Sequence, residues 1–80
     1  MAIPLQQLDN ARVVVEMSLP GRQLVLDGRG KYETRAEGNR LNVHIDDPDA
    51  PFTIVVEESS WVGQITQEID GSYRLFLGAP

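Results

Sequence analysis

The stretch HIDDPDAPF, residues 44–52, places the only histidine of the chain beside three closely spaced aspartates. On a β-strand, His44 and Asp46 point to the same side about 7 Å apart, and such a pair could bind a divalent ion. A calcium-binding loop, however, needs oxygen ligands at alternating positions, a central glycine and a final glutamate, which this stretch lacks. Asp-Pro-Asp is ordinary turn chemistry, because aspartate side chains bond the local backbone and proline restricts φ. We therefore predict a turn and no metal site.

Other catalytic groups are scarce in this sequence. The chain has no cysteine, so a nucleophilic mechanism would need His44 together with Ser59 or Ser60. No strand-turn-helix elbow that could hold such a serine is indicated. Glu57 and Glu58 are adjacent, and neighbouring strand residues point to opposite faces, so these carboxylates do not form an acid and base pair. We predict that the protein is not an enzyme, with no catalytic residue and no cofactor.

The net charge of −5 and its distribution indicate the kind of partner to expect. Residues 1–40 carry +1, from six basic and five acidic side chains, whereas residues 41–80 carry −6, from one basic and seven acidic side chains. Binding to a phosphate backbone needs clustered lysine and arginine, so we expect no nucleic-acid partner. An acidic half is suited to a basic protein partner, and association of opposite halves of two copies is the alternative.

Length and composition indicate a single small domain over residues 1–80. A chain of this size buries only about 60% of the surface that its unfolded form exposes. The lack of cysteine fits a reducing compartment, and no run approaches the roughly 18 apolar residues of a membrane span. We expect a cytoplasmic protein without a membrane partner, in which residues 1–10 form a flexible or loosely attached segment.

Apolar and polar residues alternate along almost the whole chain, with the period of two that a half-buried β-strand requires. The residues expected to face the core are Val13, Val15, Met17, Leu19, Leu24, Leu26, Tyr32, Ala36, Leu41, Val43, Ile45, Phe52, Ile54, Val56, Tyr73, Leu75 and Leu77. Turn-forming residues interrupt these runs about every ten positions, which is typical of a sandwich or barrel. We predict an all-β fold, a small antiparallel meander of about seven strands forming a closed or partly open β-barrel. A β-sandwich is the second choice.

Each turn can be given a loop length, because a slip of one residue would move a whole apolar set to the wrong face. A two-residue loop in LPGR aligns Met17 with Leu24, and a three-residue loop ending at Gly71 aligns Ile65 with Leu75. Short loops in DGRGK, EGNR and ESSW would align Leu26 with Tyr32, Ala36 with Leu41, and Ile54 with Ile65. In this register Gly30 has a left-handed conformation, and His44 lies opposite Glu33 on the solvent face.

Some apolar residues have the parity of the outward face, namely Val14, Val25, Val55 and Phe76. Isolated exposed apolar side chains are common, but a cluster of them would mark an interface. Strict alternation places Trp61 on the core face with Ile65, whereas a bulge at Gly63 would turn the tryptophan outward.

These features favour a non-enzymatic protein-binding module, such as a regulatory, inhibitory or assembly subunit, whose partner is a basic protein or a second copy of the chain. The candidate partner-binding residues are Phe76, Val55, Val14, Val25, Trp61, Asp46, Asp47, Asp49, Glu57 and Glu58. The alternative is a small-ligand or carbohydrate-binding β-barrel that uses Trp61, Tyr32 and Tyr73.

Overall fold

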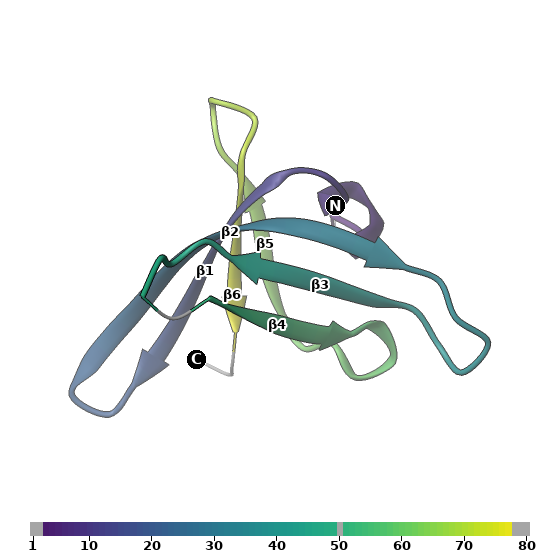
Figure 1. Ribbon diagram of the computed structural model, residues 1–80, viewed down its shortest axis with the longest axis horizontal. Coiled ribbons are helices and arrows are strands. Elements are labelled where there is room, and N and C mark those ends of the chain that lie inside the picture. The colour runs from purple at the N-terminus through teal and green to yellow at the C-terminus, as the bar shows by residue number, and fades with distance from the viewer. Residues whose placement is uncertain (1–2, 50, 78–80) are drawn as a thin grey trace.

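The computed structural model describes residues 3–49 and 51–77. Six strands form one sheet, accompanied by two short 3-10 segments, and no α-helix occurs in the described residues (Figure 1). In chain order the elements are η1 (Leu5–Leu8), β1 (Arg12–Leu19), β2 (Arg22–Glu33), β3 (Arg40–Ile45), β4 (Phe52–Glu57), η2 (Glu58–Ser60), β5 (Gly63–Gln67) and β6 (Tyr73–Leu77). The all-β prediction is confirmed. No helix in the described part of the chain is long and apolar enough to span a membrane.

The sheet is mixed and open. Its strand order is β4-β3-β2-β1-β6-β5, with β1 and β6 parallel and all other neighbours antiparallel. The strands β4 and β5 lie at opposite ends of this order and do not pair. The predicted pure meander of about seven strands is therefore wrong in its strand count and in the β1–β6 pairing, and the sheet does not close into a barrel.

Two predicted turns are confirmed. Met17 pairs with Leu24 across the β1–β2 turn, and Ile65 pairs with Leu75 across the β5–β6 turn. Gly71 has a φ of 89°, the positive value that the three-residue loop requires. In both turns the loop is short and its glycine permits a backbone conformation that other residues avoid, so the local sequence determines the register.

The predicted turn at DGRGK is wrong, because these residues lie inside β2, a continuous strand of 12 residues. Gly28 and Gly30 allow close backbone approach within this strand. A Cβ atom at Gly28 would lie 2.6 Å from the carbonyl oxygen of His44, and one at Gly30 would collide with the carbonyl oxygen of Leu8. Glycine in a strand interior can mark such an approach as well as a turn, and here tertiary packing is the reason.

The register predicted at EGNR is also wrong. Leu41 pairs with Tyr32, four residues away from the predicted partner Ala36, and residues 34–39 form a longer connection. An even shift keeps the paired side chains on their predicted face. Ala36, which we predicted to face the core, is exposed in this connection, and Leu19 and Phe52, at strand ends, are 38% and 44% exposed. The predicted pairing of Ile54 with Ile65 at ESSW fails, since η2 follows β4 and leads the chain to the far end of the sheet.

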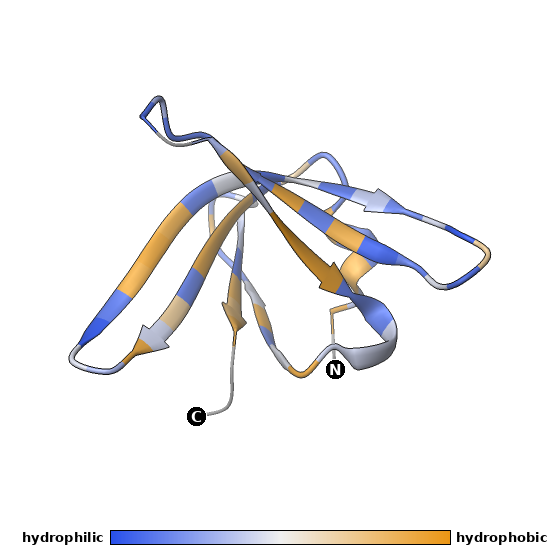
Figure 2. Ribbon diagram, turned by 60° about the horizontal axis from the view of Figure 1, so that its bottom comes forward, coloured by the Kyte–Doolittle hydropathy of each residue, from blue (hydrophilic) through white to orange (hydrophobic). Residues whose placement is uncertain are grey.

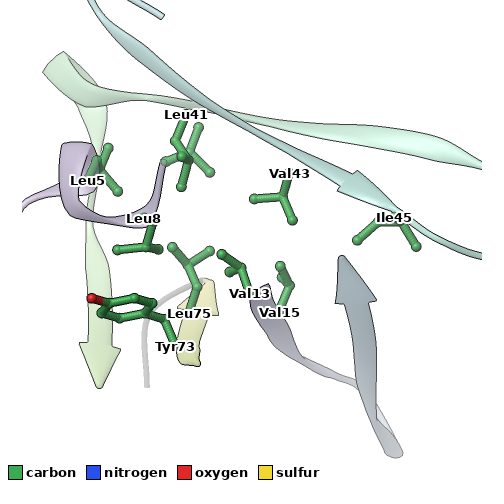
Figure 3. Close-up of a cluster of buried hydrophobic side chains, with 10 residues drawn as sticks. Leu5, Leu8, Val13, Val15, Leu41, Val43, Ile45, Tyr73 and Leu75 are labelled. Carbon is green, nitrogen blue, oxygen red and sulfur yellow. The ribbon is translucent and has the colours of Figure 1, made fainter. Parts of the chain in front are cut away.

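The core lies on the concave side of the bent sheet. Figure 2 shows hydrophobic and hydrophilic residues alternating along the strands. Side chains from both halves of the sheet meet in one cluster, formed by Leu5, Leu8, Val13, Val15, Leu41, Val43, Ile45, Val56, Tyr73 and Leu75 (Figure 3). Burial of this apolar set is the main driving force for the fold.

The segment before β1 differs from the loosely attached one that we expected. Leu5 and Leu8 of η1 are 2% and 0% exposed and lie against the core (Figure 3). The Asp9 carboxylate accepts the backbone N–H of Tyr32 at 2.9 Å, and the N–H of Asn10 bonds to the Gly30 carbonyl at 2.9 Å. Residues 3–10 are thus packed and hydrogen-bonded onto β2, while residues 1–2 lie outside the described part of the chain.

Candidate functional site

The loop between β3 and β4 contains the candidate metal ligands. The Asp47 carboxylate accepts the N–H of Asp49 at 2.9 Å, an aspartate-stabilised turn of the predicted kind. His44 is exposed and lies opposite Arg29 and Thr53, not opposite Glu33, and its Nδ1 is 2.9 Å from the Thr53 hydroxyl. Within residues 3–49 and 51–77, no group of three or more histidine or acidic side chains is arranged to hold a metal ion.

The candidate acidic residues form two groups, one at each end of β4. Asp46, Asp47 and Asp49 precede the strand, whereas Glu57 and Glu58 lie at its end. Glu57 is 3.9 Å from the Arg40 Nε, while in the described residues no salt bridge involves the three aspartates. The predicted acidic residues therefore do not form one continuous surface, because β4 separates the aspartates from the glutamates.

Glu58 is held by its neighbours. It accepts a hydrogen bond from the Tyr32 hydroxyl at 2.9 Å and another from the Asn39 amide at 3.2 Å. The pKa of Tyr32 is raised above its ordinary value, mainly by desolvation and to a smaller extent by the hydrogen bond to Glu58. Glu58 thus fixes η2 against β2.

Strand β4 is an edge strand, with β3 as its one neighbour in the described sheet. The N–H of Glu58 bonds to the carbonyl of Asn39 at 3.0 Å, directly beyond the paired residues Arg40 and Glu57. Hydrogen-bonded and non-bonded pairs alternate in an antiparallel ladder. The backbone N–H and C=O groups of Thr53, Val55 and Glu57 therefore point away from β3, toward the free edge.

The free edge of β4 is apolar. Phe52 and Val55 are 44% and 48% exposed, and Ile54 is half-buried. Beside it is a hollow of about 210 Å³, lined by Ile54, Val55, Val56, Glu57, Ser60, Trp61, Val62 and Leu77. Since Trp61 and Val62 precede β5 and Leu77 belongs to β6, this hollow lies between β4 and the opposite end of the sheet order. We call it the edge hollow.

Trp61 forms part of the wall of the edge hollow. Its side chain is half-buried and packs against the core cluster, on the side expected from strict alternation. A Cβ atom at Gly63 would collide with the indole ring, so this glycine provides room for the tryptophan. Val62 is 81% exposed. Gly63 therefore signals a tight contact with Trp61 and does not turn the indole outward.

The outward apolar residues are only partly brought together. Glu16 pairs with Val25 on one side and with Phe76 on the other, and Val14 lies on the same face of β1. Val55 is on β4, with β3 and β2 between it and β1. Val14, Val25 and Phe76 thus surround Glu16, whereas Val55 belongs to the edge of the sheet.

Sequence reasoning missed Glu16. This carboxylate is 8% exposed, and its two oxygens accept hydrogen bonds from the Gln23 amide at 2.7 Å and the Arg74 guanidinium at 2.6 Å. In the sequence it is an ordinary polar residue of the outward parity. Its burial depends on the parallel β1–β6 pairing, which brings Phe76 and Arg74 beside β1 and which no local signal indicates.

A second hollow, of about 500 Å³, is lined by Arg12, Asp27, Gly28, Arg29, His44, Ile45 and Asp46. Its main charged groups bind one another. Arg12 contacts Asp27 through two nitrogens, at 3.1 and 2.7 Å, and this hydrogen bonding holds the pKa of Asp27 below its usual value. Arg29 donates to the Asn10 carbonyl at 2.8 Å. Arg12, Asp27 and Arg29 are thus engaged with each other or with the backbone, whereas the Asp46 carboxylate of this hollow has no ion pair among the described residues.

The three aromatics of the alternative function are not gathered at one place. Tyr73 is buried, and its hydroxyl accepts a hydrogen bond from the Gln7 amide at 3.0 Å. Tyr32 is bonded to Glu58, and of the three only Trp61 lines the edge hollow. Comparisons of the chain with protein-family models, with curated proteins and with solved structures found no match.

Proposed function

We propose that this protein is a non-enzymatic protein-binding module that contacts its partner through the free edge of β4 and the edge hollow. The observation that carries the proposal is an exposed apolar edge strand beside an apolar hollow. Soluble proteins commonly protect such edges with lysine, proline or a bulge, because an unpaired strand is a template for another chain. The six residues of β4, FTIVVE, contain neither lysine nor proline.

The other end of the sheet supports this choice by contrast. β5 has the sequence GQITQ, whose polar and small residues offer little apolar surface to a partner. We propose a basic protein as the partner, because the acidic groups at both ends of β4 favour positive charge. The proposal also includes a cytoplasmic location and a role without catalysis or cofactor.

Affinity capture with three matched proteins tests the proposal: the wild type, Val55→Lys and Val25→Lys. Val55 and Val25 are similarly exposed, at 48% and 54%, but Val25 is not on an edge strand. Wild type and Val25→Lys should retain the same stoichiometric partner, and Val55→Lys should lose it. Equal retention by all three proteins, or no retained protein at all, would show that β4 is not the binding surface.

A small-ligand or carbohydrate-binding role is the second candidate, because Trp61 lines the edge hollow. Its volume of about 210 Å³ is below the roughly 300–1,000 Å³ of typical ligand pockets, which favours the protein-binding role. Trp61 is the only tryptophan, so its fluorescence reports directly on this site. A saturable change on titration with simple sugars would support the second role, and an unchanged spectrum would count against it.

A further inference from the structure

We propose that the occupant of the β4 edge is an extended segment of another protein, apolar at alternate positions and basic at its ends, which adds to the sheet as a further strand. This inference rests on the proposed function and specifies the partner's chemistry. Strand addition uses backbone hydrogen bonds for affinity and alternate side chains for specificity.

The backbone of β4 offers hydrogen-bonding groups to an added strand. Thr53, Val55 and Glu57 direct N–H and C=O groups to the free edge, and among the described residues only the Glu57 carbonyl accepts a hydrogen bond there, from the Ser60 hydroxyl at 3.5 Å. Pairing along the six residues of β4 would span about 20 Å at roughly 3.3 Å per residue. Every second side chain of the added strand would then face the same side as Ile54 and Val56.

The edge hollow offers apolar surface to the side chains of an added strand. Ile54, Trp61 and Leu77 form apolar walls on the side toward which those alternate side chains would point. An apolar residue of the partner placed here would cover surface that the described residues leave accessible, which is a favourable contribution to binding. We therefore expect apolar residues at every second position of the partner segment, as in any strand with one buried face.

Charge distinguishes another protein from a second copy of this chain. In an antiparallel pair of two β4 strands with Thr53 opposite Thr53, Asp49 of each copy would lie opposite Glu57 of the other. Directly opposed like charges destabilise a strand pair. Basic residues at both ends of a foreign segment would instead meet Asp49 at one end of β4 and Glu57 at the other. The same acidic ends protect the edge from self-association.

A peptide probe tests this inference directly. The peptide KRTVTVTVRK should slow amide hydrogen exchange at Thr53 and Val55 by about tenfold or more, because pairing protects edge amides, and should leave Val25 unchanged. The acidic peptide EETVTVTVEE should bind at least about tenfold more weakly, a factor that corresponds to 1.4 kcal/mol. The difference should shrink at high salt, since the Debye length falls to about 3 Å at 1 M.

Two variants examine the two parts of the argument separately. Val55→Pro removes an N–H that points to the free edge without removing a bond to β3, so the protein should fold but lose protection by the peptide. The double variant Asp49→Lys with Glu57→Lys should reverse the preference between basic and acidic peptides. This second variant keeps the inference testable if proline disturbs folding.

Other outcomes would overturn the inference. They include no protection of β4 amides at millimolar KRTVTVTVRK, equal binding of both peptides, or a dimer in sedimentation that Val55→Lys abolishes. A captured partner that depends on Val55 but leaves the β4 edge amides unprotected would preserve the proposed function and exclude strand addition. A partner that does not depend on Val55 would remove both.

Discussion

Glu16 of β1 and Arg74 of β6 are joined on the outer face of the sheet by a contact of 2.6 Å between Oε2 and Nη1. Val25 and Phe76 lie opposite Glu16 on its two sides, and the Gln23 amide bonds its other oxygen at 2.7 Å. Arg74 also contacts Glu68 at 2.7 Å. Because β1–β6 is the one pairing in the described sheet that no hairpin connects, this ion pair joins two distant parts of the chain.

Removing the arginine should destabilise the fold. In Arg74→Met the Glu16 carboxylate, 8% exposed in the wild type, keeps only its Gln23 bond, and an uncompensated buried charge is costly. We expect the melting temperature, measured by circular dichroism, to fall by several degrees. Adding Glu16→Gln should restore part of the loss. Arg22→Met, at an exposed arginine without an ion pair in the described residues, is the control, and equal melting of the two single variants would contradict the prediction.

Gly71→Ala should cost about 1 kcal/mol of unfolding free energy, because a Cβ atom is penalised at positive φ. The φ of Gly71 is 89°, and within the described residues no atom beyond Gly71 and its two chain neighbours lies within 4 Å of the added Cβ. The cost is therefore that of the backbone conformation alone. Urea denaturation measures it, and a neutral result would mean that another backbone conformation serves this turn equally well.

Gly30→Ala should cost more, about 3 kcal/mol, the upper end of the range for overpacked sites. The new Cβ would meet the Leu8 carbonyl, a backbone atom that cannot turn aside. Accommodating it requires η1 to move from the core. The same denaturation series that includes Gly71→Ala ranks the two variants, and a smaller loss for Gly30→Ala would contradict the packing role assigned to Gly30.

These glycines show how far the sequence determines the fold. At Gly71 the requirement is local, so alternation and loop length together predicted the register of β5 against β6. At Gly30 the same residue type serves packing against Leu8, which is distant in the sequence, so the predicted turn was wrong. A short motif cannot distinguish these two causes, because both exploit the absence of a Cβ atom.

The candidate site was predictable to a similar extent. Alternation identified Val55 as outward and Trp61 as facing the core, and both positions agree with the structure. The edge hollow could not be predicted, since it depends on which strands remain unpaired, and that follows from the β1–β6 pairing across most of the chain. Local propensity carries no information on a parallel pairing at this sequence separation.

Calcium or zinc at millimolar concentration should leave the melting temperature unchanged. Asp47 is engaged by the Asp49 N–H at 2.9 Å, and His44 contacts the Thr53 hydroxyl, so the loop offers no converging ligand set. Differential scanning calorimetry with and without the ion is the measurement. A saturable rise that disappears when Asp47 and Asp49 are changed to asparagine would contradict the turn interpretation.

Stability should fall on acidification as three carboxylates become protonated. Hydrogen bonds from Arg12, Arg35 and Ser72 lower the pKa of Asp27, Glu33 and Asp70, respectively. Their ordinary values are 3.8 for aspartate and 4.5 for glutamate, so the unfolded chain takes up protons first as the pH falls. The stabilisation is complete above these values and is lost as the pH falls through the lower folded-state pKa values.

One variant removes the main cause of the lowered pKa of Asp27. In Arg12→Gln the donor that lowers this pKa is replaced, and the 3.9 Å contact of Arg12 with Asp70 is lost as well. Its melting temperature should therefore depend less steeply on pH below about 4 than that of the wild type, since fewer carboxylates then change pKa on folding. Arg22→Gln should keep the wild-type slope. Parallel slopes for wild type and Arg12→Gln would mean that the bidentate Arg12–Asp27 contact contributes nothing to stability in solution, as is the case for many exposed ion pairs.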